Sequence, residues 1–478
     1  MPGKVNFTQA EQEEKMRKFW VVILTMGLIM ALAMPVYAVD VKFSGQYYVQ
    51  GIYDNNRSLK DNAAGDGSTA FVAQRLRVKT EFRVAEGLSL VTRFDALEKK
   101  WGDNTWGGNA NYDSVNRNSA GTSVSREQEN IEFEQVYVDF KTAIGRFLVG
   151  YQDFDAFGTS FGDSNWTRPG IKYMLPIGNT TIIAAMEQTR ENESTPTVAP
   201  TNQGLASDGD KNTYDLAFVQ KFQGGDAGLL LQYFRDASRR DASNVSTKAY
   251  FVNPYVKATF GPVYVEAEVL YGGGSYAEYE SGVTTPDVDL RTWAAYVGAK
   301  GTFGPAYVGA MFAWIQGDDP KSVGEKEGNV SSYFTHHKVF SPCLIMWGDS
   351  YYTWMGGLRG YGVAATDLTN YMDNVWFYGL YGGYKPIPKL DIRAAVYYAY
   401  ADEKPTADGL PVSPTNPRYV DKVYGTEFDL TATYKIYDNL EYMIGFAYLW
   451  TGDYFKGTND ANKTDNDYMV THKLTLNF

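Results

Sequence analysis

The chain ends on YMVTHKLTLNF, residues Tyr468 to Phe478, in which the side chains alternate between two kinds. One set is largely apolar: Tyr468, Val470, His472, Leu474, Leu476 and Phe478. The other set is mostly polar: Met469, Thr471, Lys473, Thr475 and Asn477. Because side chains alternate between the two faces of a β-strand, the stretch predicts a strand with one apolar and one wet face. The strand, and the chain, end on an aromatic residue.

The other end of the chain has the pattern of an export signal. Residues 19–34 are almost all apolar, with Arg17 and Lys18 before them and Val36-Tyr37-Ala38 after them. A basic start, an apolar centre and a small-residue site are typical of a secretory signal peptide, with cleavage expected after Ala38. A run of about 16 residues is short for a spanning helix, which needs about 20.

The chain therefore divides into a leader, residues 1–38, and one exported domain, residues 39–478. Met16 directly precedes Arg17 and is a possible true start. No second long apolar run occurs, so we expect β-structure and not membrane-spanning helices in the exported domain. We find no linker or compositional break that would divide this domain.

The composition is consistent with such a domain. Aromatic residues make up 15% of the chain, with 37 Tyr, and 47 glycines suit tight turns. The mean hydropathy of −0.35 fits strands of which only alternate residues face lipid. Cys343 is the single cysteine, so an intramolecular disulfide is excluded. The net charge of −12 argues against nucleic acid as a partner.

Period-two segments predict about eighteen antiparallel strands, with sixteen as the alternative, joined by connections of two kinds. We expect short turns at Ala85–Gly87, Thr142-Ala143, Pro176–Asn179, Gln223–Ala227, Gly261-Pro262, Gly304-Pro305, Pro386–Pro388 and Tyr437–Asn439. Long connections are expected at 54–70, 98–126, 152–166, 190–211, 236–246, 272–287, 317–372, 402–421 and 452–466. Long and short connections that alternate are typical of a transmembrane up-and-down β-barrel, with both termini on the side of the short turns.

With its signal, strand alternation, loop sorting and terminal Phe478, the mature chain resembles Gram-negative outer-membrane porins. The resemblance implies an outer-membrane location, in contact with lipid and lipopolysaccharide, and a water-filled channel for diffusion of ions and small hydrophilic solutes. It also implies a homotrimer and makes Phe478 the signal read by the barrel-assembly machinery. We expect neither enzymatic activity nor a cofactor.

Charged residues within the predicted strands should face the lumen. On the second strand, Arg75, Arg77, Lys79 and Arg83 share one face, and Arg93 on the next strand extends this basic ladder. A charge facing lipid near the bilayer centre costs about 2–4 kcal/mol, so such a row is expected to face water. Other predicted lumen charges are Glu132, Glu134, Arg146, Glu266, Glu268, Asp391, Arg393, Glu427 and Asp429. The alternation changes phase near Gln135, which predicts a β-bulge.

The third long connection, 152–166, is the candidate constriction. In the resembled family this loop commonly folds inward, and its acidic residues face a basic wall. That resemblance implies that Asp153, Asp155 and Asp163 oppose the basic ladder. The alternative is that these residues only solvate an outward loop.

The connection 317–372 is long and rich in apolar residues, among them Phe340, Trp347 and Trp354. Connections of this length are usually functional or disordered, and this one is too apolar for disorder. It could form a partial lid over the channel or pack onto other loops. A lid would favour the alternative function, a gated, substrate-specific or non-conducting barrel that serves as an adhesin or structural anchor.

Catalytic and metal sites have little support. His336-His337 lacks a nucleophile and a third metal ligand at a recognisable spacing. Gly317–Pro320 and Asn459–Asp467 are oxygen-rich enough to bind Ca²⁺ loosely, although acidic loop tips are usually only solvated. We therefore expect no catalytic residues and no metal.

Overall fold

The computed structural model describes most of residues 39–478. The described residues are 39–61, 68–102, 131–154, 156–163, 166–191, 209–322, 324–328, 339–348, 354–361, 373–406 and 412–478. The predicted leader, Asp155, His336 and His337 lie outside these ranges.

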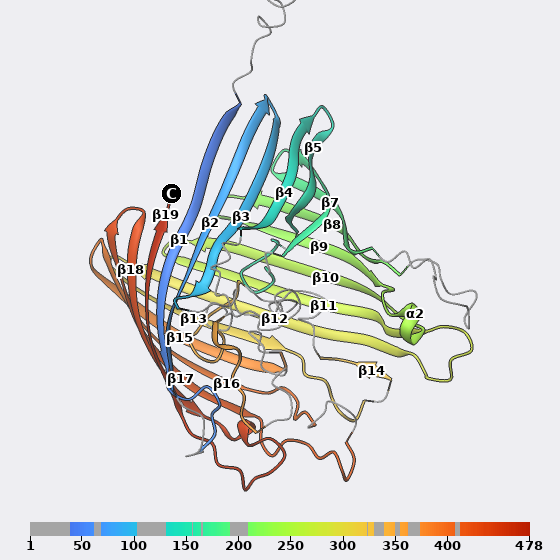
Figure 1. Cartoon of the computed structure of the whole chain (residues 1–478), viewed down its shortest axis with the longest axis vertical. Helices are drawn as coiled ribbons and strands as arrows, with labels where there is room; N and C mark the ends of the chain where they lie inside the picture. The colour runs from blue at the N-terminus through green and yellow to red at the C-terminus, as the bar shows by residue number, and fades with distance from the viewer. Residues whose placement is uncertain are drawn as a thin grey trace, which may run out of the picture.

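Eighteen antiparallel strands form one closed barrel, because the first strand pairs with both the second and the last (Figure 1). The first nine are β1 (Asp40–Asp54), β2 (Thr69–Ala85), β3 (Leu88–Lys100), β4 (Ile131–Thr142), β5 (Gly145–Asp153), β6 (Thr167–Ile177), β7 (Thr180–Arg190), β8 (Lys211–Phe222) and β9 (Gly225–Asp236). The others are β10 (Val245–Phe260), β11 (Val263–Tyr279), β12 (Val288–Phe303), β13 (Ala306–Ile315), β15 (Val375–Ile387), β16 (Leu390–Tyr400), β17 (Val423–Tyr437), β18 (Leu440–Thr451) and β19 (Asp467–Asn477). An additional two-residue strand, β14 (Glu325–Lys326), pairs in parallel with β12. The predicted eighteen strands are confirmed, and the alternative of sixteen is wrong.

The connections alternate as predicted. Eight turns of about two residues join β2–β3, β4–β5, β6–β7, β8–β9, β10–β11, β12–β13, β15–β16 and β17–β18. The predicted turns at Pro176–Asn179 and Gln223–Ala227 are too wide, because β6 continues to Ile177 and β9 begins at Gly225. The turn predicted at Pro386–Pro388 lies one to two residues later, because β15 continues to Ile387. At Pro386 the register shifts, as expected where proline cannot donate to the ladder.

Helices are short in the described part of the chain. They include α2 (Arg240–Ser243) and the 3-10 helix η2 (Asp453–Lys456). No helix there is long and apolar enough to span a membrane.

The outer face of the barrel is apolar between two rings of aromatic residues. On the side of the long loops, exposed rings include Tyr214, Tyr233, Tyr250, Trp293, Tyr398 and Trp450. On the side of the short turns they include Phe43, Phe260, Phe303, Tyr384, Tyr437 and Phe478. Trp293 and Phe303 are ten residues apart on β12, which a tilted strand converts into about 25 Å, the height of a membrane band.

The predicted phase change near Gln135 is confirmed. On β3, Phe94 pairs with Phe133 while the preceding Arg93 pairs with Gln135, so Glu134 is the extra residue of a bulge. The bulge keeps Phe133 on the outer face and places Gln135 beside Arg93 on the inner face. Glu134 itself reaches Arg77 and Arg93.

Candidate pore and its inward loops

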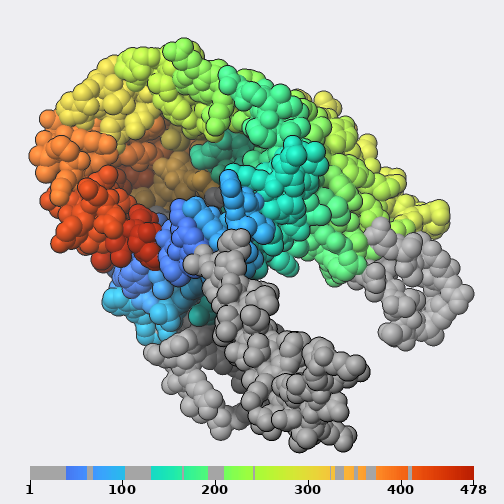
Figure 2. All heavy atoms as spheres, turned by 90° about the horizontal axis from the view of Figure 1, so that it is seen from above, coloured from blue at the N-terminus to red at the C-terminus, as the bar shows by residue number. Residues whose placement is uncertain are grey.

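The hollow of the barrel is ringed by strands (Figure 2). The described parts of two long connections are hydrogen-bonded to carboxylates of its inner wall. We call the β5–β6 connection, residues 154–166, the short inward loop, and the β13–β15 connection, residues 316–374, the long inward loop.

The short inward loop is attached to the wall by one buried carboxylate. Glu268 of β11, 1% exposed, accepts hydrogen bonds from the backbone N–H of Thr159 (2.9 Å) and of Gly162 (3.1 Å). The Thr159 hydroxyl donates to the same oxygen at 2.5 Å, and the Asn253 amide donates to the other oxygen at 2.9 Å. A charged acceptor with this many donors forms strong hydrogen bonds, so the loop tip is fixed against β11.

Glycine is required where this loop approaches the carboxylate. A Cβ atom at Gly158 or at Gly162 would lie 2.1 Å from an oxygen of Glu268. Gly158 also has a positive φ of 81°, which side chains other than glycine rarely adopt. Lys257 of β10 adds a second attachment, because its ammonium donates to the Gly158 carbonyl at 3.0 Å.

The long inward loop is attached in the same way to another strand. Glu427 of β17, fully buried, accepts the backbone N–H groups of Leu344 (2.9 Å), Ile345 (2.7 Å) and Met346 (2.7 Å). The neighbouring Asp429 accepts the Leu344 N–H as well, at 3.2 Å.

Cys343 precedes this attachment and is buried at 3% exposure. Burial and the nearby carboxyl groups of Glu427 and Asp429 raise the pKa of the Cys343 thiol well above its ordinary value. The backbone N–H of Trp347 donates to its sulfur at 3.1 Å. The single thiol of the chain is therefore protected as long as this loop is docked.

A second part of the long inward loop contacts the loops of neighbouring strands. The Arg57 guanidinium donates to the carbonyl of Gly356 at 2.9 Å, and the Gly360 N–H donates to the Ser58 carbonyl at 2.9 Å. The Tyr361 N–H donates to the Phe455 carbonyl at 2.7 Å. The predicted packing onto other loops is thus confirmed for this part of the connection, and a partial lid over the channel stays a prediction.

The two inward loops meet in an aromatic cluster. Phe161 of the short loop packs edge-to-face on Phe340 of the long loop, with ring centroids 5.4 Å apart. Both rings also contact Tyr296 of β12, at 5.4 and 5.1 Å, and Phe340 contacts Trp347 at 4.9 Å. Movement of one loop is therefore expected to disturb the other.

The predicted basic ladder is compensated by carboxylates from the wall itself. Arg77 forms two hydrogen bonds to Asp95, at 2.7 and 2.6 Å, and one to Glu134 at 3.0 Å. Arg93 donates to Glu134 at 2.6 Å and to Asp153 at 3.2 Å.

Arg75 completes this group, 3.5 Å from Glu98 and 3.9 Å from Asp95. We call the group the arginine cluster: Arg75, Arg77 and Arg93 with Asp95, Glu98, Glu134 and Asp153. Its three cations are outnumbered by four carboxylates.

The rest of the ladder lies toward the short turns. Lys79 is exposed on the same face. Arg83 pairs with Glu81 at 2.7 Å and with Asp40 at 3.6 Å. Arg146 pairs with Asp139 across the β4–β5 hairpin.

Two of the three acidic residues predicted for the constriction lie within the described residues. Asp153 is the last residue of β5, where it contacts Arg93, while Asp163 belongs to the tip of the short inward loop, with its N–H bound to the Thr159 carbonyl at 3.1 Å. Asp155 lies outside the described residues. Asp153 pairs with Arg93 of the ladder at 3.2 Å, and the role of Asp163 at a constriction stays a prediction.

The other predicted lumen charges bind mainly to tyrosines. Glu266 accepts from the hydroxyls of Tyr264 (2.8 Å) and Tyr296 (2.7 Å). Asp391 and Arg393 likewise bond to tyrosine hydroxyls, those of Tyr307 at 3.0 Å and Tyr397 at 2.7 Å. Glu132 lies opposite Asp95 in the β3–β4 register.

Sequence reasoning missed Glu98 as a member of the arginine cluster. Strict alternation from Asp95 would place residue 98 on the outer face. Leu97 has a positive φ of 52°, and the β2–β3 register shifts between Gln74 and Leu76, so the phase changes there. Leucine rarely adopts a positive φ, so the sequence does not predict the change of phase at Leu97.

Phe478 is 50% exposed at the barrel rim, where its N–H and carbonyl exchange hydrogen bonds with Gly45 at 3.0 and 2.7 Å. The terminal aromatic therefore closes the β1–β19 seam. The predicted role as an assembly signal stays a prediction.

No protein-family model and no curated protein matches this chain. Among solved structures it is similar to OccK2 (OpdF) of Pseudomonas aeruginosa, at 9% identity over 92% of this chain and 98% of that chain, with a TM-score of 0.49. It is also similar to an anion-selective porin from Comamonas acidovorans, at 11% identity over 92% and 99% of the chains, with a TM-score of 0.43. A third is the outer membrane channel DcaP of Acinetobacter baumannii, at 14% identity over 92% and 97%, with a TM-score of 0.41. The fold itself is shown by the closed barrel of eighteen antiparallel strands.

Proposed function

We propose that this protein is an outer-membrane channel for passive diffusion of ions and small hydrophilic solutes. The observation that carries the proposal is a closed barrel whose inner wall bears charged side chains and whose outer wall is an apolar band between aromatic rings. Charges on the inner wall are stable only if water fills part of the lumen.

The two inward loops would set the width of the pore, and the arginine cluster would set its ion preference. Because carboxylates outnumber arginines in this cluster, we propose a modest preference for cations. The sequence alone left the sign open, since its most regular inward strand is basic.

The test is single-channel recording of the purified barrel in a planar bilayer under a salt gradient. Stable openings with a reversal potential of cation-preferring sign are expected. A folded barrel that never conducts would contradict an open pore, and an anion-preferring potential would contradict the role of the cluster.

A gated channel is the second candidate, favoured by the contact between Phe161 and Phe340 inside the barrel. Comparison of the protein with a Glu427→Gln variant separates the two. A lid predicts rare openings that become frequent in the variant, whereas a fixed constriction predicts stable openings in both proteins.

A further inference from the structure

Two buried aspartates meet at the seam of the barrel, where its first and last strands end toward the long loops. Asp54 is the last residue of β1 and Asp467 is the first of β19, and the two strands pair side by side (Figure 1). Their carboxyl groups lie within hydrogen-bonding reach of each other, and the residues are 1% and 0% exposed. We call these two residues the aspartate pair.

Few groups of the described residues compensate the charge of this pair. One oxygen of Asp467 accepts a backbone N–H at 2.8 Å, whereas its other oxygen and both oxygens of Asp54 accept no well-aligned hydrogen bond. Arg57 is the nearest cation, with its Nη1 3.8 Å from Asp54. The phenols of Tyr53 and Tyr468, the other ionisable groups that act on the pair, carry no charge near neutral pH.

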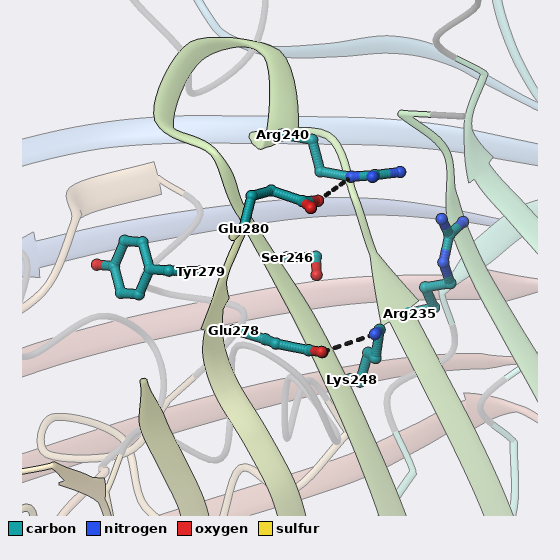
Figure 3. Close-up of a pocket in the computed structure, with 7 residues that line it drawn as sticks. All are labelled: Arg235, Arg240, Ser246, Lys248, Glu278, Tyr279 and Glu280. Atoms are coloured by element: carbon teal, nitrogen blue, oxygen red, sulfur yellow. Dashed lines mark hydrogen bonds and ion pairs between the residues drawn. The ribbon is translucent and has the colours of Figure 1, made fainter. Parts of the chain in front are cut away.

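The carboxylates near the end of β11 show the usual arrangement, in which each is neutralised by its own cation. Glu280 accepts a hydrogen bond from Arg240 of α2 at 2.6 Å, and Glu278 lies 2.7 Å from Lys248, as the dashed lines in Figure 3 mark. Lys248 and Glu278 are also 44% and 39% exposed, so water surrounds them in part. The aspartate pair has neither a cation in direct contact nor access to water.

A shared proton resolves this imbalance. Two ionised carboxylates in a buried place would repel each other, and one cation at 3.8 Å compensates them only in part. With one proton between them, the O–H of one carboxyl group donates to the facing oxygen of the other. The pair then carries one negative charge, which Arg57 balances. A metal ion is a less suitable occupant, because Arg57 would repel it.

Arg57 connects the aspartate pair to the long inward loop. The same Nη1 that faces Asp54 donates to the Ile345 carbonyl at 3.4 Å, and Nε donates to the Gly356 carbonyl at 2.9 Å. A second negative charge on the pair would draw the guanidinium toward it and away from these carbonyls. Because Ile345 also donates its N–H to Glu427, this contact lies beside the principal attachment of the loop.

We propose that the aspartate pair holds one proton while the long inward loop is docked, and that loss of this proton weakens docking through Arg57. The docked state then binds more protons than the undocked state, in which water and the guanidinium can reach both carboxylates. Docking is therefore strongest at acidic pH and weakens as the pH rises. The inference goes beyond a channel for diffusion and does not depend on conduction.

The proton can be detected by infrared difference spectroscopy of the purified barrel near neutral pH. A protonated carboxyl group has a C=O stretching band that neither a carboxylate nor an amide shares. Asp54→Asn and Asp467→Asn should each remove one such band, because the remaining carboxylate has no partner with which to share a proton. The double variant should remove no more than either single variant.

The other outcomes of this measurement contradict a shared proton. Loss of half the band in each single variant would assign one proton to each aspartate, and no loss in either would mean an ionised or metal-bound pair. Asp465→Asn is the matched control, since Asp465 is exposed two residues before Asp467 and loses the same charge. Its spectrum should keep the band, and disappearance there would overturn the assignment to the pair.

The link to the loop can be measured by maleimide labelling of Cys343 in the unchanged protein and in Asp467→Asn, at about pH 6 and about pH 9. Both proteins carry the same thiol and the same Glu427 and Asp429, so the ratio of their rates at one pH cancels the ionisation of those groups. The rates should agree within about twofold at the lower pH.

At the higher pH the unchanged protein should label about fivefold faster or more than Asp467→Asn, because only the unchanged protein has a proton to lose. Slower labelling of the variant is a gain of protection, which misfolding cannot imitate. A ratio that is the same at both pH values would overturn the link between the aspartate pair and the loop.

Discussion

The two inward loops are attached to the barrel by the same kind of contact, but the number of carboxylates differs between them. In each, one buried glutamate on a wall strand accepts backbone N–H groups of the loop, Glu268 for the short loop and Glu427 for the long loop. The short loop needs two glycines to approach its glutamate. The long loop has a second carboxylate, Asp429, beside the first.

The comparison shows how a barrel can position loops without a matching side-chain motif. A carboxylate on a wall strand binds backbone N–H groups, which almost every residue has. The side chains of the loop are therefore not constrained by this contact, except where the backbone comes so close to the carboxylate that only glycine fits. Docking of the short loop requires glycine at two positions, whereas docking of the long loop depends on its hydrogen bonds to two carboxylates. Substitutions should therefore affect the two loops differently.

Glu427→Gln should give the largest effect. The amide loses the charge that three backbone N–H groups share, and hydrogen bonds to charged groups contribute about 1.5–3 kcal/mol each. We expect docking of the long loop to weaken by about 3 kcal/mol, which is about a hundredfold in the equilibrium. Cys343, the single thiol, reports this directly, because maleimide labelling requires the loop to leave the wall.

Asp429→Asn is the control for that prediction. Asp429 accepts one N–H of the loop, at 3.2 Å, which Glu427 also accepts. Its replacement should raise the labelling rate far less than Glu427→Gln does. Equal rates in the two variants would show that Glu427 is not the principal attachment.

Glu268→Gln should have a smaller effect, confined mainly to the short loop. Lys257 still binds the Gly158 carbonyl, so the loss should be about 2 kcal/mol. Hydrogen exchange of the amides of Thr159 and Gly162 should accelerate about thirtyfold. Glu266→Gln, two residues away and bound to tyrosine hydroxyls, should leave that exchange unchanged.

The contact between the loops can be measured by a double-mutant cycle. Phe161→Ala and Phe340→Ala should each raise the labelling rate of Cys343, and the double variant should show less than the sum of the two effects. Aromatic pairs contribute about 0.5–1.5 kcal/mol beyond burial, so a coupling of about 1 kcal/mol is expected. Strict additivity would mean that the loops dock independently and would weaken the gated alternative.

The sequence predicted the barrel well because strand alternation is local. Each strand of β1 to β19 that spans the band shows its two faces in its own residues, and the turns at Gly261 and Gly304 carry glycine where φ is +58° and +59°. The lumen charges Glu268 and Glu427 were predicted for the same reason. Alternation predicts which face of the sheet a side chain lies on, but not which groups it contacts there.

The attachments could not be predicted because they depend on distant backbone. Nothing in Leu344-Ile345-Met346 marks these residues as partners of Glu427, more than 80 residues later. The role expected for Asp153 and Asp163 came from a resemblance; Asp153 pairs with Arg93, and the role of Asp163 stays a prediction. Which loop enters a barrel follows from tertiary contacts, which periodicity does not encode.

The smallest expected effect concerns the base of the long loop and its dependence on pH. The Lys321 N–H and, secondarily, the Arg418 guanidinium, whose Nη2 lies 2.5 Å from the carboxylate, lower the pKa of Asp319 below its ordinary value of 3.8. A lowered pKa means that the stabilisation is complete above pH 3.8 and is lost only as the pH falls below it. Because the carboxylate is 37% exposed, the contribution should be well under about 1 kcal/mol.

We therefore expect hydrogen exchange around Arg418, corrected for its intrinsic pH dependence, to be constant from pH 7 to 4.5 and to accelerate by about twofold below pH 3.5. The reference is Asp319→Asn, in which Arg418 keeps its second carboxylate partner, Glu403, at 3.6 Å. In that variant the segment should exchange faster already at pH 6, and its exchange should change little as the pH falls. An acid response as large in the variant as in the unchanged protein would show that Asp319 is not its source. Docking of the long loop would then depend on Glu427 and on the aromatic contacts of the loop. The two loops would differ only in how they are attached to the barrel wall, and the Asp319–Arg418 pair would not contribute.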